Sequence, residues 1–158
     1  MTQSEIIQNL ANKFGERIAE SSPELLEPFI VVKPSDIPEV MAYLKNEPVL
    51  SMDFLNLISG VDWDKENRME IVYHLSSIKH HHQIVVRAVL SRENPSVPTV
   101  SNLWGTANWH ERETYDLMGI NFEGHPDLRR ILLPDDWIGH PLRKDYVFPE
   151  EYHGVKWA

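Results

Sequence analysis

Two apolar runs joined by a short polar turn constrain the fold of this 158-residue chain more than any other feature. Residues 69–75 place a large apolar side chain at every second position, and residues 84–90 do the same. Successive side chains of a strand point to opposite faces of a sheet, so each run indicates a strand with a buried face. Only a short segment around Lys79–His82 separates the two runs. They therefore predict an antiparallel hairpin.

The residues before this hairpin show mixed periods. Residues 4–20 carry apolar side chains at helical spacing and predict an amphipathic surface helix. The β-branched run 29–32 predicts a short strand, and a second helix follows Ser35. In residues 50–63, the spacing of the first half fits a helix and that of the second half a strand. We therefore expect a short helix there that runs into a strand at Ser59.

After a polar, proline-containing loop at residues 91–98, a helical stripe returns over residues 100–118, with Gly105 as a possible break. Gly119 is placed to end this helix as its C′ residue. This order of elements predicts an α+β two-layer sandwich, with a small mixed or antiparallel sheet and flanking helices. We expect a globular α+β domain at residues 1–118 and an extended, irregular docking tail at residues 119–158.

Composition excludes several classes of function. Fifteen Lys and Arg residues against 24 Asp and Glu residues give a net charge of -9, which argues against binding to nucleic acid. Without cysteine, the chain cannot form a disulfide, hold an iron–sulfur cluster through thiolates or use a thiol nucleophile. No apolar run approaches the roughly 20 residues that cross a bilayer, and no glycine-rich phosphate loop precedes a helix. We therefore expect no membrane span and no nucleotide or flavin site.

Two groups of histidines are candidates for metal sites. The run Lys79–His82 contains three imidazoles, but consecutive residues of a turn point in different directions and do not converge on one ion. His110 and Glu113 are separated by three residues on the predicted helix, which brings their side chains together. A metallohydrolase that uses this pair is the enzymatic alternative, although further ligands would be needed.

The helix at residues 108–118 carries a second stripe beside its apolar one. Trp109, Arg112, Glu113 and Asp116 lie at positions i, i+3, i+4 and i+7. Trp and Arg are enriched at the energetic centres of protein interfaces, so the stripe predicts a docking surface. The alternative is a half-buried core tryptophan with incidental ion pairs.

Glu111 falls in phase with the apolar stripe of the same helix. A buried carboxylate needs an arginine or several hydrogen bonds, because unpaired burial costs several kcal/mol. Arg87 and the arginines of the tail are the available partners. We predict structural pairing of Glu111 rather than catalysis.

The tail repeats one pattern, a Gly-His-Pro turn followed by Leu and a basic pair, within residues 124–130 and 139–144. Glycine and proline fix such turns. The tail also carries many large apolar side chains, which are unfavourable in water without a partner. We therefore expect it to be ordered against another surface.

The contiguous run of residues 107–137, extended by residues 139–146, resembles the signature of the 30 kDa subunit family of respiratory complex I, the C subunit of NADH-quinone oxidoreductase. The resemblance implies a stand-alone, non-catalytic subunit in the peripheral arm of a proton-translocating enzyme. It also implies docking on the D subunit, which carries the quinone site, near the cluster-bearing B subunit. The place of docking would be the cytoplasmic side of the bacterial inner membrane, with membrane association only through the complex.

The same resemblance implies that NADH, FMN, iron–sulfur clusters and quinone belong to the assembled complex, and none to this chain. Related subunits occur in membrane-bound hydrogenases and in ferredoxin or F420H2 dehydrogenase complexes. The electron donor is therefore left open.

The resemblance names no catalytic residue. It assigns a docking and structural role to Trp109, Glu111, Arg112, Glu113, Asp116, His125, Pro126, Asp127, Arg129, Arg130, Trp137, Pro141, Arg143, Lys144 and Asp145. Three hypotheses follow from the sequence: an assembly subunit of a quinone oxidoreductase, a metallohydrolase and a free-standing protein-binding module.

Overall fold

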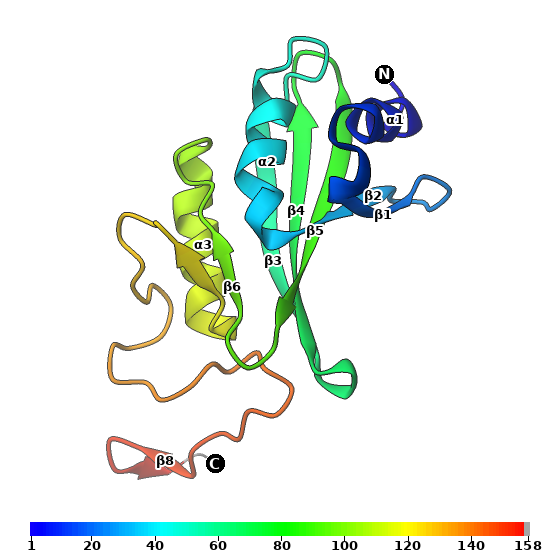
Figure 1. Cartoon of the computed structure of the whole chain (residues 1–158). Helices are drawn as coiled ribbons and strands as arrows, with labels where there is room; N and C mark the ends of the chain where they lie inside the picture. Colours follow the sequence, from blue (N-terminus) through cyan, green and yellow to red (C-terminus); the bar gives the residue numbers. More distant parts are fainter. Residues whose placement is uncertain (157–158) are drawn as a thin grey trace.

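The computed structural model describes residues 1–156, which form one five-stranded sheet, two small sheets and three α-helices (Figure 1). The helices are α1 (Gln3–Phe14), α2 (Ile37–Asn46) and α3 (Gly105–Met118). The strands are β1 (Ile18–Ser22), β2 (Phe29–Val32), β3 (Phe54–Trp63), β4 (Arg68–Ser77), β5 (His82–Ser91), β6 (Ser96–Pro98), β7 (Asn121–Glu123), β8 (Glu151–Tyr152) and β9 (Val155–Lys156).

The main sheet has the order β1-β2-β5-β4-β3, in which only the β2–β5 pair is parallel. The inward side chains of β4 and β5 share one core with the apolar faces of all three helices, including Leu10, Leu44 and Met118. The opposite face of the sheet carries a smaller cluster around Phe29, Val72 and Val85. The predicted α+β two-layer fold with a mixed sheet is therefore confirmed.

The predicted hairpin is also confirmed. β4 and β5 pair over their full lengths, with Tyr73 opposite Val86. The alternation places Tyr73 and Ile71 in the core with no exposed surface. Between the strands, His81 adopts a positive φ of 53° and closes the turn.

The helix predicted in the first half of residues 50–63 is wrong, because residues 54–63 form strand β3. An irregularity in the β3–β4 register lies between Leu55 and Leu57. This bulge changes the phase of the strand, so that both Leu55 and Ile58 face the core. Their separation of three residues imitates the spacing of a helix.

The first helix is shorter than the predicted span of residues 4–20. α1 ends at Phe14, because Gly15 has a φ of 55°, and the chain then turns into β1 at Ile18. The last helix begins at Gly105 rather than at residue 100, so Gly105 starts α3 instead of breaking it.

The tail contains more regular structure than the sequence predicts. β7 pairs in parallel with β6, which lies in the predicted loop at residues 91–98, and β8 and β9 form a hairpin near the C-terminus. Between β7 and β8 the chain runs without helix or strand across the lower part of the molecule in Figure 1. The division of the chain at residue 118 into a domain and a docking tail stays a prediction.

Candidate docking site

Helix α3 is the element on which the candidate site is built. The indole N–H of Trp104, just before the helix, donates to the carbonyl oxygen of Met52 at 3.1 Å and fixes the start of α3 against the core. Gly119 ends the helix in the left-handed conformation, with a φ of 72°, and its N–H donates to the carbonyl oxygen of Tyr115 at 2.8 Å. The predicted C′ role of Gly119 is confirmed.

The tail binds the last carbonyl groups of α3. A helix end leaves carbonyls without intrahelical partners. His140 Nδ1 lies 2.9 Å from the backbone carbonyl oxygen of Asp116. The Leu142 N–H donates to the carbonyl oxygen of Leu117 at 3.0 Å, and Arg143 Nε donates to that of Met118 at 2.8 Å. Burial and the neighbouring arginines lower the pKa of His140, which favours the neutral imidazole. The second Gly-His-Pro turn is therefore a cap for α3.

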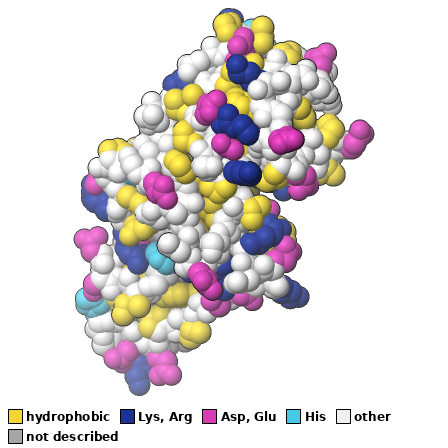
Figure 2. All heavy atoms as spheres, in the orientation of Figure 1, with side chains coloured by type: hydrophobic (Ala, Val, Ile, Leu, Met, Phe, Trp, Pro, Cys, Tyr) yellow, Lys and Arg dark blue, Asp and Glu magenta, His cyan; other side chains and the backbone are white. Residues whose placement is uncertain are grey.

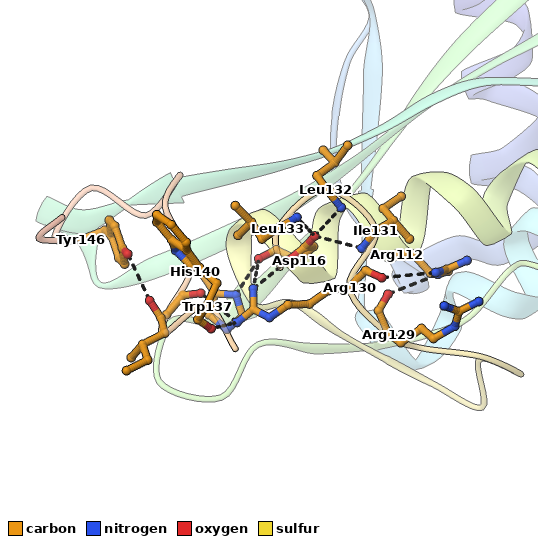
Figure 3. A network of polar contacts seen from close by, with 12 residues as sticks. Arg112, Asp116, Arg129, Arg130, Ile131, Leu132, Leu133, Trp137, His140 and Tyr146 are labelled. Carbon is orange, nitrogen blue, oxygen red and sulfur yellow. Dashed lines mark hydrogen bonds and ion pairs between the residues drawn. The ribbon is translucent and has the colours of Figure 1, made fainter. Parts of the chain in front are cut away.

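Asp116 is the centre of the first anchor of the tail. Its Oδ2 accepts the backbone N–H groups of Ile131, Leu132 and Leu133 at 3.0, 2.8 and 2.9 Å, and its Oδ1 accepts Arg130 at 2.7 Å (Figure 3). Burial by itself raises the pKa of the Asp116 carboxyl. The three N–H donors and Arg130 outweigh burial and hold this pKa below its usual range. The carboxylate is therefore charged at neutral pH and folds the loop 131–133 around itself.

Two arginines continue this network, as Figure 3 shows. Arg130 Nη2 donates to the carbonyl oxygens of Trp137 and Gly139, both at 3.0 Å. Arg112, one turn before Asp116 on α3, donates to the carbonyl oxygens of Arg129 and Arg130 at 3.2 and 3.3 Å. Both guanidinium groups thus bind the tail backbone of this chain.

Asp62, at the end of β3, makes a second anchor. Its carboxylate accepts both Nε and Nη2 of Arg92, at 2.7 and 3.1 Å, and the backbone N–H of Lys144 at 2.8 Å. Arg92 also reaches Asp145 at 2.8 Å. The hydrogen bonds from Arg92 hold the pKa of Asp62 below its usual range, against the effect of burial. The sheet therefore holds the tail directly at residues 144–145.

Glu111 is completely buried, as predicted, but the prediction that an arginine pairs with it is wrong. Its carboxylate accepts the backbone N–H of Val100 at 2.7 Å and the hydroxyl of Thr99, and His125 Nε2 lies 3.8 Å away. Arg87 instead lies over the ring of Phe29 on the other face of the sheet, at 3.8 Å. Burial raises the pKa of Glu111 to about 7, and the two hydrogen bonds oppose this rise only in part.

The predicted surface stripe of α3 is wrong for two of its four members. Trp109 is 62% exposed and Glu113 is also exposed, but Arg112 and Asp116 lie buried beneath the tail. The spacing identified one helix face correctly. The part of that face with Arg112 and Asp116 is covered by the chain's own C-terminal segment.

The remaining signature residues divide into those that hold the backbone and those at the surface. His125 contacts the carbonyl oxygen of Asn108 at 3.2 Å and accepts the N–H of Asp127 at 3.0 Å. Trp137 and Pro141 are half-buried. Pro126, Asp127, Arg129, Lys144 and Asp145 are exposed, and Arg129 pairs with Asp127 at 3.0 Å. Their docking role stays a prediction.

The metallohydrolase hypothesis requires ligands beyond His110 and Glu113. These two residues line a groove of about 300 Å³ between α3 and β3. Within residues 1–156, no three His, Cys, Asp or Glu side chains come together where they could hold a metal ion. In the histidine run, His80 and His82 bind the carbonyl oxygens of Pro48 and Leu50. The geometry gives this hypothesis no support.

Sequence reasoning missed Asp62 and Arg92 entirely. Asp62 lies on the inward side of β3, in phase with Ile58 and Gly60, so a carboxylate at a buried strand position was the available signal. Arg92 gave no signal, because its partners Asp62 and Asp145 are distant in sequence.

Comparisons with known proteins agree with this architecture. A family model described as the 30 kDa subunit of respiratory-chain NADH dehydrogenase matches residues 30–152. The chain belongs to this family. The C subunit of NADH-quinone oxidoreductase from Chlorobium phaeobacteroides is 43% identical over 91% of this chain and 88% of its own length. Its counterpart from Chloroherpeton thalassium is also 43% identical, over 93% of this chain, which spans 62% of that longer protein.

Two solved structures share the fold of this chain. The trypsin-resistant fragment (1-134) of Nqo5 is 33% identical, has a TM-score of 0.66, and covers 80% of this chain and 100% of the fragment. A chain in the membrane-bound sulfane sulfur reductase, an archaeal respiratory membrane complex, is 24% identical with a TM-score of 0.76, over 91% of this chain and 85% of that chain. The second match shows a shared fold alone. Within the described part of this chain, no helix is long and apolar enough to span a bilayer.

Proposed function

We propose that this chain is a peripheral-arm subunit of a proton-translocating NADH:quinone oxidoreductase and that it contributes a docking surface rather than an active site. Its family membership and its 43% identity to the C subunits of two such enzymes support this proposal. Two charged side chains of α3, Asp116 and Arg112, bind the backbone of the tail and so have a structural role. Electron transfer and proton translocation would belong to the complex, together with its NADH, FMN, iron–sulfur clusters and quinone.

The observation that carries the docking role is the apolar surface of the anchored tail. Ile138 is 87% exposed, Val147 84%, and Leu132 and Phe148 59% each. Yellow side chains are visible on the lower part of the molecule, where the tail lies (Figure 2). Water does not favour such a concentration of large apolar groups on an ordered segment, whereas a protein interface does. We expect a neighbouring protein of the complex to bury these apolar side chains.

We infer that the neighbours are the D subunit, which carries the quinone site, and the B subunit, on the cytoplasmic side of the bacterial inner membrane. The tail is held by a few polar anchors and exposes large apolar side chains. In the isolated chain the tail would then be cut by protease before the sheet domain.

The test compares a basic side chain of the tail with one outside the signature. Arg143→Ala removes the donor that binds Met118 at the end of α3, whereas Lys79→Ala removes an exposed side chain in the turn between β4 and β5. Native gels should show that Arg143→Ala lowers the amount of assembled complex and that Lys79→Ala does not. Quinone-reductase activity per assembled complex should stay normal in both variants.

Normal assembly of Arg143→Ala with lost turnover would contradict the proposal. The electron donor is tested by measuring quinone reduction in membranes that contain the assembled complex. NADH should reduce quinone, and a requirement for reduced ferredoxin or F420H2 would favour a related complex.

A further inference from the structure

The tail forms a pocket on its own surface, separate from the contacts with α3. Its volume is about 310 Å³, at the small end of the range for ligand sites, which suits one long side chain rather than a cofactor. It is lined by residues 136–139, 146, 147, 149, 151 and 152. The pocket is therefore made from three parts of the tail.

The aromatic side chains of Trp137, Tyr146 and Tyr152 line it, and Phe148 packs against two of them. The rings of Trp137 and Tyr152 lie 5.2 Å apart with an angle of 48° between their planes. Tyr146 stands nearly perpendicular to Phe148, at 5.1 Å, and Phe148 in turn contacts Trp137 at 6.4 Å. Aromatic faces carry negative electrostatic potential and attract cations that are brought within about 6 Å.

The charge at the pocket is negative as well. Its lining contains the carboxylates of Asp136 and Glu151, and none of the described lining residues is Lys or Arg. Tyr152 and His153 each donate to one oxygen of Asp136 at 2.7 Å, and these bonds lower the pKa of Asp136. A carboxylate has about four acceptor sites, so Asp136 can accept a further donor. Two basic side chains lie beside the lining. Lys156 is opposite Glu151 in the β8–β9 hairpin, and Arg130, which binds the carbonyl oxygens of Trp137 and Gly139, is already paired with Asp116.

The pocket is held in shape before any partner arrives. Arg130 binds the carbonyl oxygens of Trp137 and Gly139 and connects them to Asp116 (Figure 3). Tyr146 donates to the Ile138 carbonyl oxygen at 3.0 Å, and its ring would lie 2.7 Å from a Cβ at position 139. Only glycine, at a φ of 83°, permits this packing. A preformed site loses less conformational freedom on binding than a mobile one.

We propose that this aromatic pocket accepts a lysine or arginine side chain from a neighbouring protein of the complex. The rings of Trp137 and Tyr152 are too close together to admit a cation between them, so the cation would lie on the pocket side of Tyr152 and pair with Asp136 and Glu151. Ile138 and Val147, both more than 80% exposed, would pack beside the stem of that side chain. This inference rests on the proposed function, because it requires a protein neighbour at the tail.

The first experiment uses the isolated full-length chain and a matched pair of small probes. Ethylguanidinium carries the charge of an arginine head group, whereas ethylurea has nearly the same shape without charge. In heteronuclear NMR spectra, we expect saturable shifts of the Trp137 indole and Gly139 amide signals with millimolar ethylguanidinium, and none with ethylurea. Trp109, already stacked on Arg112 at 5.2 Å, is the internal control.

Glu151→Gln should weaken the binding of ethylguanidinium at least threefold. Glu150→Gln, an exposed neighbour that does not line the pocket, is the matched control. Equal shifts with ethylurea, or no saturable shift with either probe, would overturn the inference.

The second experiment uses the assembled complex. A photoreactive residue at Val147, on the rim of the pocket, should cross-link to a segment of another protein of the complex that contains a lysine or arginine. Replacement of that basic residue by methionine should lower the yield at least threefold. A link to lipid or a yield that is indifferent to the basic residue would overturn the inference. Absence of the unmodified chain from any complex would instead contradict the proposed function, and the NMR result would be unaffected.

Discussion

The sheet domain, including Ile120 and Phe122, and the tail beyond β7 are stabilised by different interactions. In the sheet domain, apolar side chains such as Leu10, Ile71 and Met41 have no exposed surface, whereas in the tail Ile138 is 87% exposed and Val147 84%. The tail is held through the carboxylates of Asp116 and Asp62 and the guanidinium groups that accompany them. Apolar burial is spread over many residues, but an anchor of this kind depends on one side chain. The tail should therefore be easier to release than the domain is to unfold.

Two carboxylates on α3 show the same contrast on a smaller scale. Glu111 points into the domain and Asp116 binds the tail, and both are completely buried. Asp116 receives three backbone N–H donors and an arginine, so its pKa is lowered. Glu111 receives one backbone N–H and one hydroxyl, so burial dominates and its pKa rises to about 7. Burial raises the pKa of both carboxyls, and only at Asp116 do the donors outweigh it.

The largest expected effect is that of Asp116→Asn, which removes the charge from the first anchor. Attachment of the tail should weaken by about 3 kcal/mol, because Arg130 is left in a half-buried site without its counter-charge. Hydrogen exchange should show faster exchange of the amides of residues 131–133, while the amides of β4 and β5 keep their protection. Asp127→Asn, at an exposed carboxylate paired with Arg129, is the control and should leave exchange unchanged.

An equal loss of protection in the sheet would contradict the separation between domain and tail. Low pH should have the same effect as Asp116→Asn, because protonation also removes the charge of the Asp116 carboxylate. Since the pKa of Asp116 is lowered in the folded chain, its contribution is complete above the ordinary pKa of about 4 and is lost as the pH falls through the lower folded value.

The domain should respond to pH in the opposite direction. The folded pKa of Glu111 is raised from 4.5 to about 7, so the folded chain holds a proton that the unfolded chain releases. The free energy of unfolding should decline as the pH rises from about 4.5 to about 8, by roughly 3 kcal/mol in total. Glu111→Gln should remove most of this decline in denaturant titrations. The same slope in the variant and in the original chain would contradict the assignment to Glu111.

A smaller loss of stability is expected from Gly60→Ala, at the contact between α3 and the sheet. A Cβ at position 60 would lie 3.0, 3.1 and 3.2 Å from side-chain atoms of Ile120, Met118 and Thr114. Gly60→Ala should therefore lower the free energy of unfolding by about 1–2 kcal/mol in denaturant titrations. Gly105→Ala, where no atom lies within 4 Å, is the control and should be neutral or slightly stabilising. A neutral Gly60→Ala would show that α3 can shift on β3.

The smallest effect is expected from Asp145→Asn, at the exposed side of the second anchor. Its carboxylate pairs with Arg92 at 2.8 Å but remains accessible to water. Exposed ion pairs contribute about 0.2–1 kcal/mol, so the amide of Lys144 should exchange only slightly faster. The effect should decrease at high salt. A loss as large as that of Asp116→Asn would show that the two anchors are coupled.

The sequence determined the features that depend on local period and residue type. The alternation at residues 69–75 and 84–90 predicted the central hairpin, and the helical phase of Glu111 predicted its burial. Gly119 marked the end of α3. The contiguous signature at residues 107–137 indicated the family, which the family model and the relatives confirmed. Each of these signals lies within one short stretch of chain.

Only the tertiary structure decided which groups meet across long distances in the sequence. A register bulge between Leu55 and Leu57 turned a helical spacing into a strand. Asp62 binds the backbone of Lys144, and Arg112 and Asp116 bind a tail that covers part of the face predicted to be free. Hydrogen bonds and ion pairs depend on distances of about 3 Å between atoms, and periodicity along the chain carries no information about them. Local sequence thus predicted which side chains are buried in the domain, and the fold decided what the charged ones bind.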